Sequence, residues 1–560
     1  MVLTFKPVQW LRFAIRTAAL LALGQAAVAA APPNAYPEPN VPAASAELSP
    51  SPEVIPAPPA PQGPQPPFTG PVLNQSPQAP VVPRASPAAT DRPLPINLAT
   101  ALCLSNARPL VIAFAQNSVE LAAAQLQQAK VLWLPNFNAG VDYYRHDGYD
   151  QQTDGEMINV SKSYIAAGGG ATLDFGITDA IFLPLAARRE LAAREFQLEA
   201  ARNDALATVA TTYFDVQEAR GRLAGNLDAT AKGRELEREI KGLVGGQAAG
   251  GLVPAIEVDR VLALLYDLEQ EAAASRAAWQ TSSARLNRVL RLNPGAVVVP
   301  IEPPQLQVTL IPPGRVVDDL VPVGLLNRPE LASQKALVQA TLERLRQERV
   351  RPLLPSVVLT GGGPRGAFTG GVFEGSPNDD PYTGGGRFDL ELAAVWTLDN
   401  LGAGNRALVR QRSAQQQRAL LDFFDTQDRV AEEVVQAHAQ LEAAAVQVGQ
   451  AEAGVREAST TFQGTRIGLR QPVRAGGLLQ LINRPQEAVA ALQHLNRAYD
   501  NYFIAVNGYN RAQFQLYRAM GYPARILICD RPLGETQDVD TSRPAAMAPV
   551  CPNGMSSPCP

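Results

Sequence analysis

Residues able to do chemistry are few in this chain of 560 residues, which holds three histidines and four cysteines. Gly361, Gly363 and Gly366 satisfy the phosphate-binding pattern G-x-G-x-x-G, but their flanks are typical of strand and loop and no helix follows, which favours flexible loop glycines. Glu235, Glu237 and Glu239 alternate with arginines along one helix and are typical of a solvated charged face. The sequence therefore predicts no enzyme, with no catalytic residue, no cofactor site and no metal site. His146, His438 and His494 are expected at the surface.

Charge and hydropathy exclude two further classes of protein. The 49 basic and 53 acidic residues give a net charge of −4, so there is no basic surface for nucleic acid. The mean hydropathy of −0.08 argues against a polytopic helical membrane protein, whose spans each need about 20 apolar residues. Only 18% of the residues are charged, against about 25% in ordinary soluble domains.

The N-terminal region predicts export. Residues 1–30 are typical of a signal peptide, with Lys6, Arg12 and Arg16 before an apolar stretch and a small-residue cleavage site at 27–29. An uncleaved anchor helix is the alternative. Residues 31–95 hold 21 of the 48 prolines and are expected to form a disordered, extended linker.

The cysteines offer two candidate disulfides, one of them in the C-terminal tail. The four cysteines are even in number in an exported chain, so disulfides are permitted. Cys551 and Cys559 bracket a short loop in the Pro/Cys-containing tail, residues 524–560, and form a candidate disulfide. Cys103 with Cys529 is the second candidate pair.

An internal repeat of about 220 residues organises the rest of the chain. Pro109 and Pro329 precede similar helical stretches, and Thr172-Leu173-Asp174 recurs as Thr397-Leu398-Asp399. We therefore expect a first unit over 96–305 and a second over 306–523, each with a helix, a strand pair, a very long helix, a Gly-rich turn and a long helix.

Heptad spacing predicts coiled-coil packing of the long helices. Val434, Leu441 and Val448 start a seam that continues to Leu469, and a second seam runs from Ala488 to Leu516. In the first unit a helix over about 183–242 is expected, about 90 Å long at 1.5 Å per residue. On the helices alone, a rod-like periplasmic coiled-coil scaffold is equally consistent with the sequence.

Two regions switch to the period of two that indicates strands, at about 136–175 and 356–398. Phe137, Ala139 and Val141 alternate with polar residues, and so do Leu390 and Leu392. Strands of about ten residues with one apolar and one polar face are typical of a transmembrane barrel, with loops at 148–162 and 364–385. Two hairpins capping a soluble coiled coil are the alternative. Four strands are too few to close a barrel, so the chain would pool its strands with copies of itself.

At this point the chain resembles the TolC-like outer membrane efflux protein family, over about 94–523. The matching stretches are Leu134-Pro135 and Leu354-Pro355 before the strands, TLDFG (172–176) and TLDNLGAG (397–404) leading into the long helices, ATTYFDVQEAR (210–220) and YNRAQFQLYRAMGYP (509–523). The resemblance implies a homotrimer in the outer membrane, whose twelve strands form one barrel and whose helices form a periplasmic tunnel. It also implies two partners, a periplasmic adaptor (membrane fusion) protein and an inner-membrane pump.

The resemblance extends to the turns between the long helices. GGLVPAIEV (250–258) is similar to the family's adaptor-docking tip, which implies adaptor contacts at Gly250, Gly251, Leu252 and Val253. The corresponding residues of the second unit are Gly476, Gly477 and Leu478. The periplasmic aperture would be lined by Glu257, Asn483 and Gln486, where some members of the family carry aspartates, and Pro485 would alter the start of the last helix.

The function expected from the sequence is a passive exit duct from periplasm to exterior, in a tripartite efflux or type I secretion system. The first alternative is the periplasmic coiled-coil scaffold, and the second is an exported enzyme that uses the Gly-rich segment. No pattern in the sequence identifies the transported substrate.

Overall fold

The computed structural model describes residues 72–74, 84–106, 108–245, 253–361, 371–376, 384–387, 390–475 and 478–522. Long helices dominate these residues, as the heptads predict. The helices are α2 (Leu98–Ser105), α3 (Leu110–Lys130), α4 (Ile177–Gly245), α5 (Ile256–Leu290), α6 (Val317–Asn327), α7 (Pro329–Val350), α8 (Ala403–Arg470) and α9 (Pro485–Ala519).

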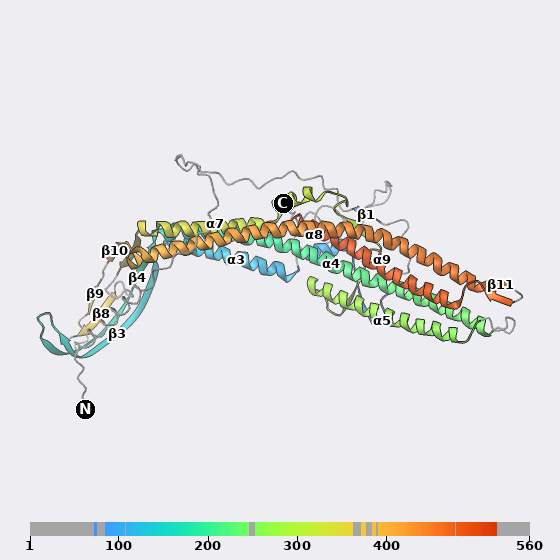
Figure 1. Ribbon diagram of the computed structural model, residues 1–560. Coiled ribbons are helices and arrows are strands. Elements are labelled where there is room, and N and C mark those ends of the chain that lie inside the picture. The colour runs from blue at the N-terminus through green and yellow to red at the C-terminus, as the bar shows by residue number, and fades with distance from the viewer. Residues whose placement is uncertain are drawn as a thin grey trace, which may run out of the picture. The chain divides into compact units, whose positions relative to one another are not determined.

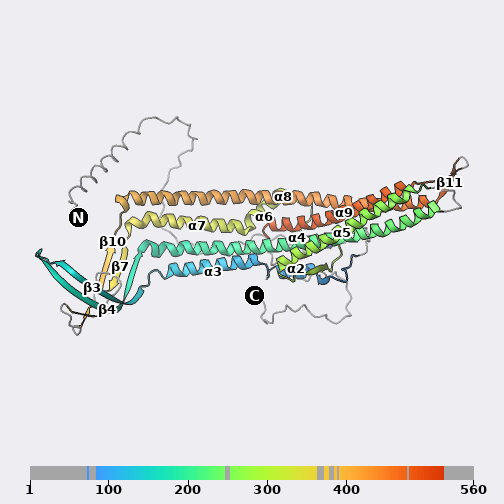
Figure 2. The same ribbon diagram turned by 90° about the horizontal axis from the view of Figure 1, so that it is seen from below.

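The long helices lie side by side in a layer with two open edges (Figures 1 and 2). Next to the strands the order is α3–α4–α7–α8 (Figure 2), and toward the opposite helix ends it is α5–α4–α9–α8 (Figure 1). Helix α8 therefore forms one edge along its whole length, and α3 and α5 form the other. The elements follow the same order in the two halves of the chain, helix, strands, long helix, turn, helix.

The predicted seams form the core between the helices. Every seam residue of α8 named above is buried, and α9 buries Leu495, Tyr502 and Leu516 completely. Small residues let α4 approach its neighbours closely: a Cβ atom at Gly221 would lie 2.5 Å from the ring of Phe503 on α9. The α4–α9 contact thus requires glycine at position 221.

Helix α4 is longer than the predicted 183–242. It has 69 residues, about 100 Å at 1.5 Å per residue, and starts directly after the preceding strand at Ile177. Pro184 therefore lies inside the helix, beyond its first turn. A proline there removes one helical hydrogen bond to the carbonyl four residues earlier.

The strands at the head of the helices form one antiparallel sheet. It contains β3 (Asn136–Gln151), β4 (Met157–Gly176), β7 (Ser356–Gly361), β8 (Gly371–Ser376), β9 (Gly384–Arg387) and β10 (Leu390–Val395). Strand β4 pairs with β3 on one side and with both β7 and β8 on the other, while β9 pairs with β8 and β10 pairs with β7. The sheet is thus four strands wide, in the order β3, β4, β7 with β8, β10 with β9.

Strands β3 and β4 are longer than the predicted ten residues, whereas β10 is shorter and ends at Val395, before Trp396 and Leu398. β3 has 16 residues and β4 has 20, so only 152–156 connect them and the predicted loop at 148–162 is wrong. The predicted loop at 364–385 is wrong for the same reason, because it contains β8 and the start of β9. These stretches lack apolar alternation, but their main-chain groups pair all the same.

The register places the predicted apolar residues of different strands on one face. Because residues opposite each other in an antiparallel pair share a face, Phe137 lies with Ala171, and Leu173 lies with Leu359. Leu359 in turn pairs with Leu392 of β10. Both Phe137 and Leu392 are more than 70% exposed, so none of the residues that the structure describes covers the apolar face at these positions.

A connector joins the two halves of the chain midway along the helices. It contains β5 (Ala296–Pro300) and β6 (Gln307–Thr309) before α6, and its strands pair with two from the N-terminal region. β1 (Val72–Asn74) is antiparallel to β6, and β2 (Arg92–Ile96) is parallel to β5. Residues 84–95 are therefore packed on the helices and are no linker. Their anchors include the buried Arg220, whose guanidinium donates to the carbonyls of Ala85 and Pro300.

One stretch among the described residues, Leu98–Lys130, is long and apolar enough to cross a membrane by length and composition alone. It is not one helix, because α2 ends at Ser105 and α3 begins after Pro109. Leu98 and Leu102 of α2 are buried in the core. The break shows two helices, and the burial shows that the first of them packs into the core.

Candidate functional site: the helix tips

The two tips are the turns that connect α4 to α5 and α8 to α9, at the ends of the helices remote from the sheet (Figure 1). Gly250, Gly251 and Leu252 of the first tip lie outside the described residues, as do Gly476 and Gly477 of the second. What the structure shows is how the residues on either side of them are held.

Val253 is not presented at the surface of the first tip. Its side chain is 3% exposed and belongs to the hydrophobic core between the helices. The expectation that this side chain contacts an adaptor therefore does not fit the single chain, because the side chain packs inward just before α5 begins.

The second tip is a short β-hairpin where the sequence predicts a plain Gly-rich turn. β11 (Pro472–Ala475) pairs with β12 (Leu478–Leu481), so the main chain of Leu478 lies opposite Ala475. Pro485 occupies the first position of α9, where its missing N–H costs no helical hydrogen bond. The proline therefore sets the start of the helix without distorting it.

Two of the three predicted aperture residues come together at the tips. Glu257 is in the first turn of α5, its side chain is 10% exposed, and it accepts a hydrogen bond from Arg260 at 2.5 Å. Arg260 also donates to Oε1 of Gln486, on α9, at 3.5 Å. One guanidinium thus joins the first tip to the second, and the other carboxylate oxygen of Glu257 is buried without a hydrogen-bond partner among the residues that the structure describes.

Asn483, the third predicted aperture residue, lies against α8. A Cβ atom at Gly468 would be 2.5 Å from its side-chain oxygen, so the asparagine fills the space that the glycine leaves. In the single chain this contact packs the loop before α9 against the end of α8.

A charge cluster, not predicted from the sequence, joins α4 to α8 just behind the tips. Arg466 donates to Glu239 and lies 2.8 Å from Glu235, and Arg470 also donates to Glu239. Burial alone would raise the pKa of Glu239, but the hydrogen bonds from the two arginines outweigh it and hold that pKa below its ordinary value. The interpretation of the three glutamates as a solvated face is therefore wrong for Glu239, whose side chain is 17% exposed, and incomplete for Glu235, which is 45% exposed but also meets Arg466 of α8. Glu237 pairs with Lys241 on its own helix at 2.6 Å.

The partners of this cluster are more than 220 residues apart, so no local spacing reveals them. The only sequence signal was the run of alternating charges on α4, which fits a solvated face equally well. The contact of His438 is equally invisible to local spacing. Its Nε2 lies 2.7 Å from the carbonyl oxygen of Arg315 and its side chain is 12% exposed, so the prediction that this histidine lies at the surface is wrong.

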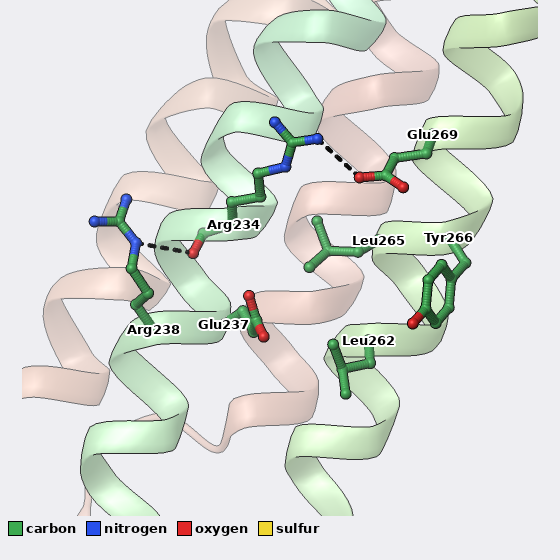
Figure 3. Close-up of a pocket in the computed structure, with 7 residues that line it drawn as sticks. All are labelled: Arg234, Glu237, Arg238, Leu262, Leu265, Tyr266 and Glu269. Carbon is green, nitrogen blue, oxygen red and sulfur yellow. Dashed lines mark hydrogen bonds and ion pairs between the residues drawn. The ribbon is translucent and has the colours of Figure 1, made fainter.

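A groove opens between α4 and α5 above the first tip (Figure 3). Its volume is about 390 Å³, and Leu262 and Tyr266 supply an apolar wall on α5. Arg234 spans the groove to Glu269 at 2.8 Å, and Nε of Arg238 donates to the carbonyl of Arg234 at 3.3 Å. An apolar wall with a charged rim is suited to contact with an amphipathic protein surface rather than to catalysis.

The described residues hold no group of three or more His, Cys, Asp or Glu side chains arranged to bind a metal ion. Cys529, Cys551 and Cys559 lie outside the described residues, so neither candidate disulfide is tested, and Cys103 is an exposed thiol. Gly363 and Gly366 of the Gly-rich pattern are likewise outside them, while Gly361 ends β7.

The fold is that of channel proteins of the outer membrane. The CmeC outer membrane channel of Campylobacter jejuni has a TM-score of 0.58 at 16% identity, over 76% of this chain and 85% of that one. The outer membrane protein VceC of Vibrio cholerae gives 0.58 at 16%, over 76% and 96%. The MtrE outer membrane channel of Neisseria gonorrhoeae, in its open state, gives 0.59 at 14%, over 80% and 98%.

Residues 320–521 match the model of the outer membrane efflux protein family. The resemblance to the TolC-like outer membrane efflux proteins is therefore confirmed, and so is the expected location in the outer membrane, with the helices in the periplasm. The family consists of channels and transport proteins rather than enzymes. No curated protein matches the chain in sequence.

Proposed function

We propose that three copies of this chain form a passive exit duct from the periplasm to the exterior, as the outer-membrane component of a tripartite efflux or type I secretion system. The observation that carries the proposal is the uncovered apolar face of the sheet. Strands β3 and β4, with 16 and 20 residues, are long enough to cross a lipid bilayer, and an open sheet edge cannot remain in lipid.

The sheet and the helix layer each end in two open edges, and the edges of the one lie above those of the other. The sheet ends in β3 on one side and in β10 with β9 on the other, and below it the helix layer ends in α3 and α8. Phe114 of α3 and Leu421 of α8 are 69% and 67% exposed on these edge helices. Joining one edge to the opposite edge of the next copy closes a ring, and three copies supply twelve strands, above the minimum of about eight for a barrel.

The polar face of the sheet then lines a wet lumen. Asn138 donates to Thr172 across β3 and β4 at 2.8 Å, and Asp174 and Glu391 lie on the same face. Such side chains remain hydrated in a channel and would be costly in lipid.

For the tips, we infer that Gly250, Gly251 and Leu252, with Gly476, Gly477 and Leu478, meet a periplasmic adaptor protein. The groove of Figure 3 lies next to the first tip and extends the surface available to that partner. Glu257, Gln486 and the loop at Asn483 would surround the aperture, and an inner-membrane pump would supply the energy. The chain itself then needs no catalytic residue.

The domain organisation that goes with this function has a signal peptide at 1–30, a first unit ending near 305, a second unit over 306–523 and a tail at 524–560. The linker expected over 31–95 ends before residue 84, because the structure packs residues 84–95 on the helices, and it contains β1 at Val72–Asn74.

Reconstitution into planar lipid bilayers tests the duct. The purified protein should produce stepwise conductance, because a closed barrel with a polar lumen conducts ions. A preparation that is folded by circular dichroism but inserts into vesicles without any conductance would contradict the proposal.

A further inference from the structure

The inner edge of β6 is held by two buried amide side chains of α9. Asn510 accepts from the N–H of Val308 and donates to the carbonyl of Leu306, both at 2.8 Å. Gln513 accepts from the N–H groups of Leu310 and Ile311 and donates to the carbonyl of Ile311. Both amides are almost completely buried, at 1% and 0% exposed. They replace the hydrogen bonds that a neighbouring strand would supply.

Strand β5 is held in the same way by α5. The indole N–H of Trp279 donates to the carbonyl of Val298, the N–H of Val298 donates to Ser283, and Asn287 donates to the carbonyl of Ala296. In each half of the connector, therefore, side chains of one helix bind the inner edge of a short strand, and these hydrogen bonds do not involve the second strand.

The outer edge of β6 is left to accept another strand. Successive main-chain groups along a strand point to opposite sides, so when Val308 faces α9, Gln307 and Thr309 face outward. In the structure β1 fills this edge, with Val72 opposite Thr309 and Asn74 opposite Gln307.

The two strands from the N-terminal region differ in how firmly they are anchored. β2 pairs over five residues, and the segment before it is fixed by Arg220 and by Asp91, which forms a 2.7 Å ion pair with Arg276. β1 pairs over three residues only. Pro71 and Pro77 flank it in the sequence and lack the N–H that would extend the ladder.

We propose that the outer edge of β6 is a strand-acceptor site for an extended segment of a partner protein, and that β1 occupies it in cis as a displaceable strand. The acceptor is built by Asn510 and Gln513 and does not depend on β1. The fitting ligand is an extended, proline-free stretch of three or more residues, recognised through its main chain.

The tether sets the competition between β1 and such a ligand. Residues 75–83 join β1 to the anchored segment at Arg84, so β1 competes as part of the same chain, at an effective concentration of about 1 mM for a short linker. A free peptide therefore reaches the site only when β1 is removed, or when a partner presents its segment from a second contact.

Disulfide trapping tests first whether β1 sits on this edge. In a full-length chain whose four native cysteines are replaced by serine, Asn74→Cys and Gln307→Cys should form an intramolecular disulfide, because paired Cα atoms lie about 5.5 Å apart. Asn74→Cys combined with Gln305→Cys, two residues out of register, is the control. Equal yields from the two pairs, or none from the first, would overturn the assignment of the resident strand.

The second experiment tests displacement in trans. The probe is a synthetic peptide of residues 70–78 with cysteine in place of Asn74, added to the serine-background chain that carries Gln307→Cys. The adduct, measured by mass spectrometry in a thiol redox buffer, should increase at least tenfold when Asn74→Pro in the chain removes the resident N–H. A peptide that also carries Val72→Pro should give little adduct.

Equal labelling of the chain with and without Asn74→Pro would mean that β1 does not compete, and equal labelling by the two peptides would mean simple collision. Either result would overturn the strand-acceptor site. Near-ultraviolet circular dichroism of each variant, measured first, establishes that the chains compared are equally folded. Neither outcome depends on conductance, so the site and the exit duct can fail separately.

Discussion

Arg466 of α8 lies 2.8 Å from Glu235 of α4, so a charge from the second half of the chain meets a carboxylate from the first close to the helix tips. Glu239 adds a second carboxylate to the same guanidinium and also accepts from Arg470. Behind the tips, the two halves of the chain are therefore joined through ionic contacts as well as through apolar packing. Loosening these contacts changes how the tips are held relative to each other.

Replacing Glu239 by glutamine should loosen the tips with only a small loss of stability. The side chains involved are partly exposed, so we expect about 0.5–1 kcal/mol from thermal unfolding. Amide hydrogen exchange near residue 466 should become faster. Glu237→Gln is the matched control, since it removes only the ion pair to Lys241 on the same helix. Indistinguishable exchange in the two variants would show that the α4–α8 contact does not hold the tips.

The same contact makes a prediction for pH. The pKa of Glu239 is lower in the folded chain than in the unfolded one, so the ionised form stabilises the fold above the ordinary glutamate pKa. That stabilisation is lost as the pH falls through the lowered folded value. Protection factors at the tips, which are corrected for the intrinsic pH dependence of amide exchange, should therefore be constant near neutrality and fall in acid, and the fall should be absent in Glu239→Gln. An equal acid response in both proteins would assign it to other groups.

Leu392→Arg should impair insertion into the membrane. The side chain lies on the apolar face, opposite Leu359, and an arginine near the bilayer midplane of a barrel costs about 2–4 kcal/mol. Ala393→Arg, one residue along on the polar face, should insert at close to the normal yield. Folding into lipid vesicles, measured by protease protection, compares the two. If the yields are reversed, the assignment of the two faces is wrong.

Gly221→Ala should destabilise the helix layer. The added methyl group would meet Phe503 at 2.5 Å, and overpacking of this kind costs about 1–3 kcal/mol. Gly454→Ala on α8 has open space at the same position and should be neutral or stabilising, because alanine favours helix. Thermal unfolding of both proteins checks the pair, and a neutral Gly221→Ala would mean that α4 and α9 are further apart than described.

For the docking proposal, Leu252→Asp should abolish efflux in cells while the yield of assembled protein stays normal, since a charge at the tip would disturb adaptor contact alone. Leu227→Asp, at an exposed position of α4 away from the tips, is the control and should transport normally. Normal efflux in the Leu252 variant would remove the tip assignment.

Much of the fold was predictable because it rests on repeated local patterns. The heptad residues of α8 and α9 are buried as expected, and the alternating apolar residues of β3 and β10 share one face of the sheet. The strand ends were not predictable, since Gly148 and its neighbours pair through the main chain without any apolar alternation.

The sequence was less informative about the tips. The family resemblance points to the turns between the long helices, but it does not reveal that Val253 is buried or that Arg260 joins Glu257 to Gln486. Such contacts depend on the relative placement of α4, α5, α8 and α9, which no local spacing encodes. The amides of Asn510 and Gln513 lie within a recognised family stretch, yet their role becomes visible only when β6 is placed beside them.

The most direct test of the exit duct is the mass of the purified particle. Light scattering in a mild detergent, corrected for bound detergent, should give three chains, and removal of the detergent should precipitate the protein, since the apolar face of the sheet would then meet water. A stable, folded monomer in plain buffer would contradict the account.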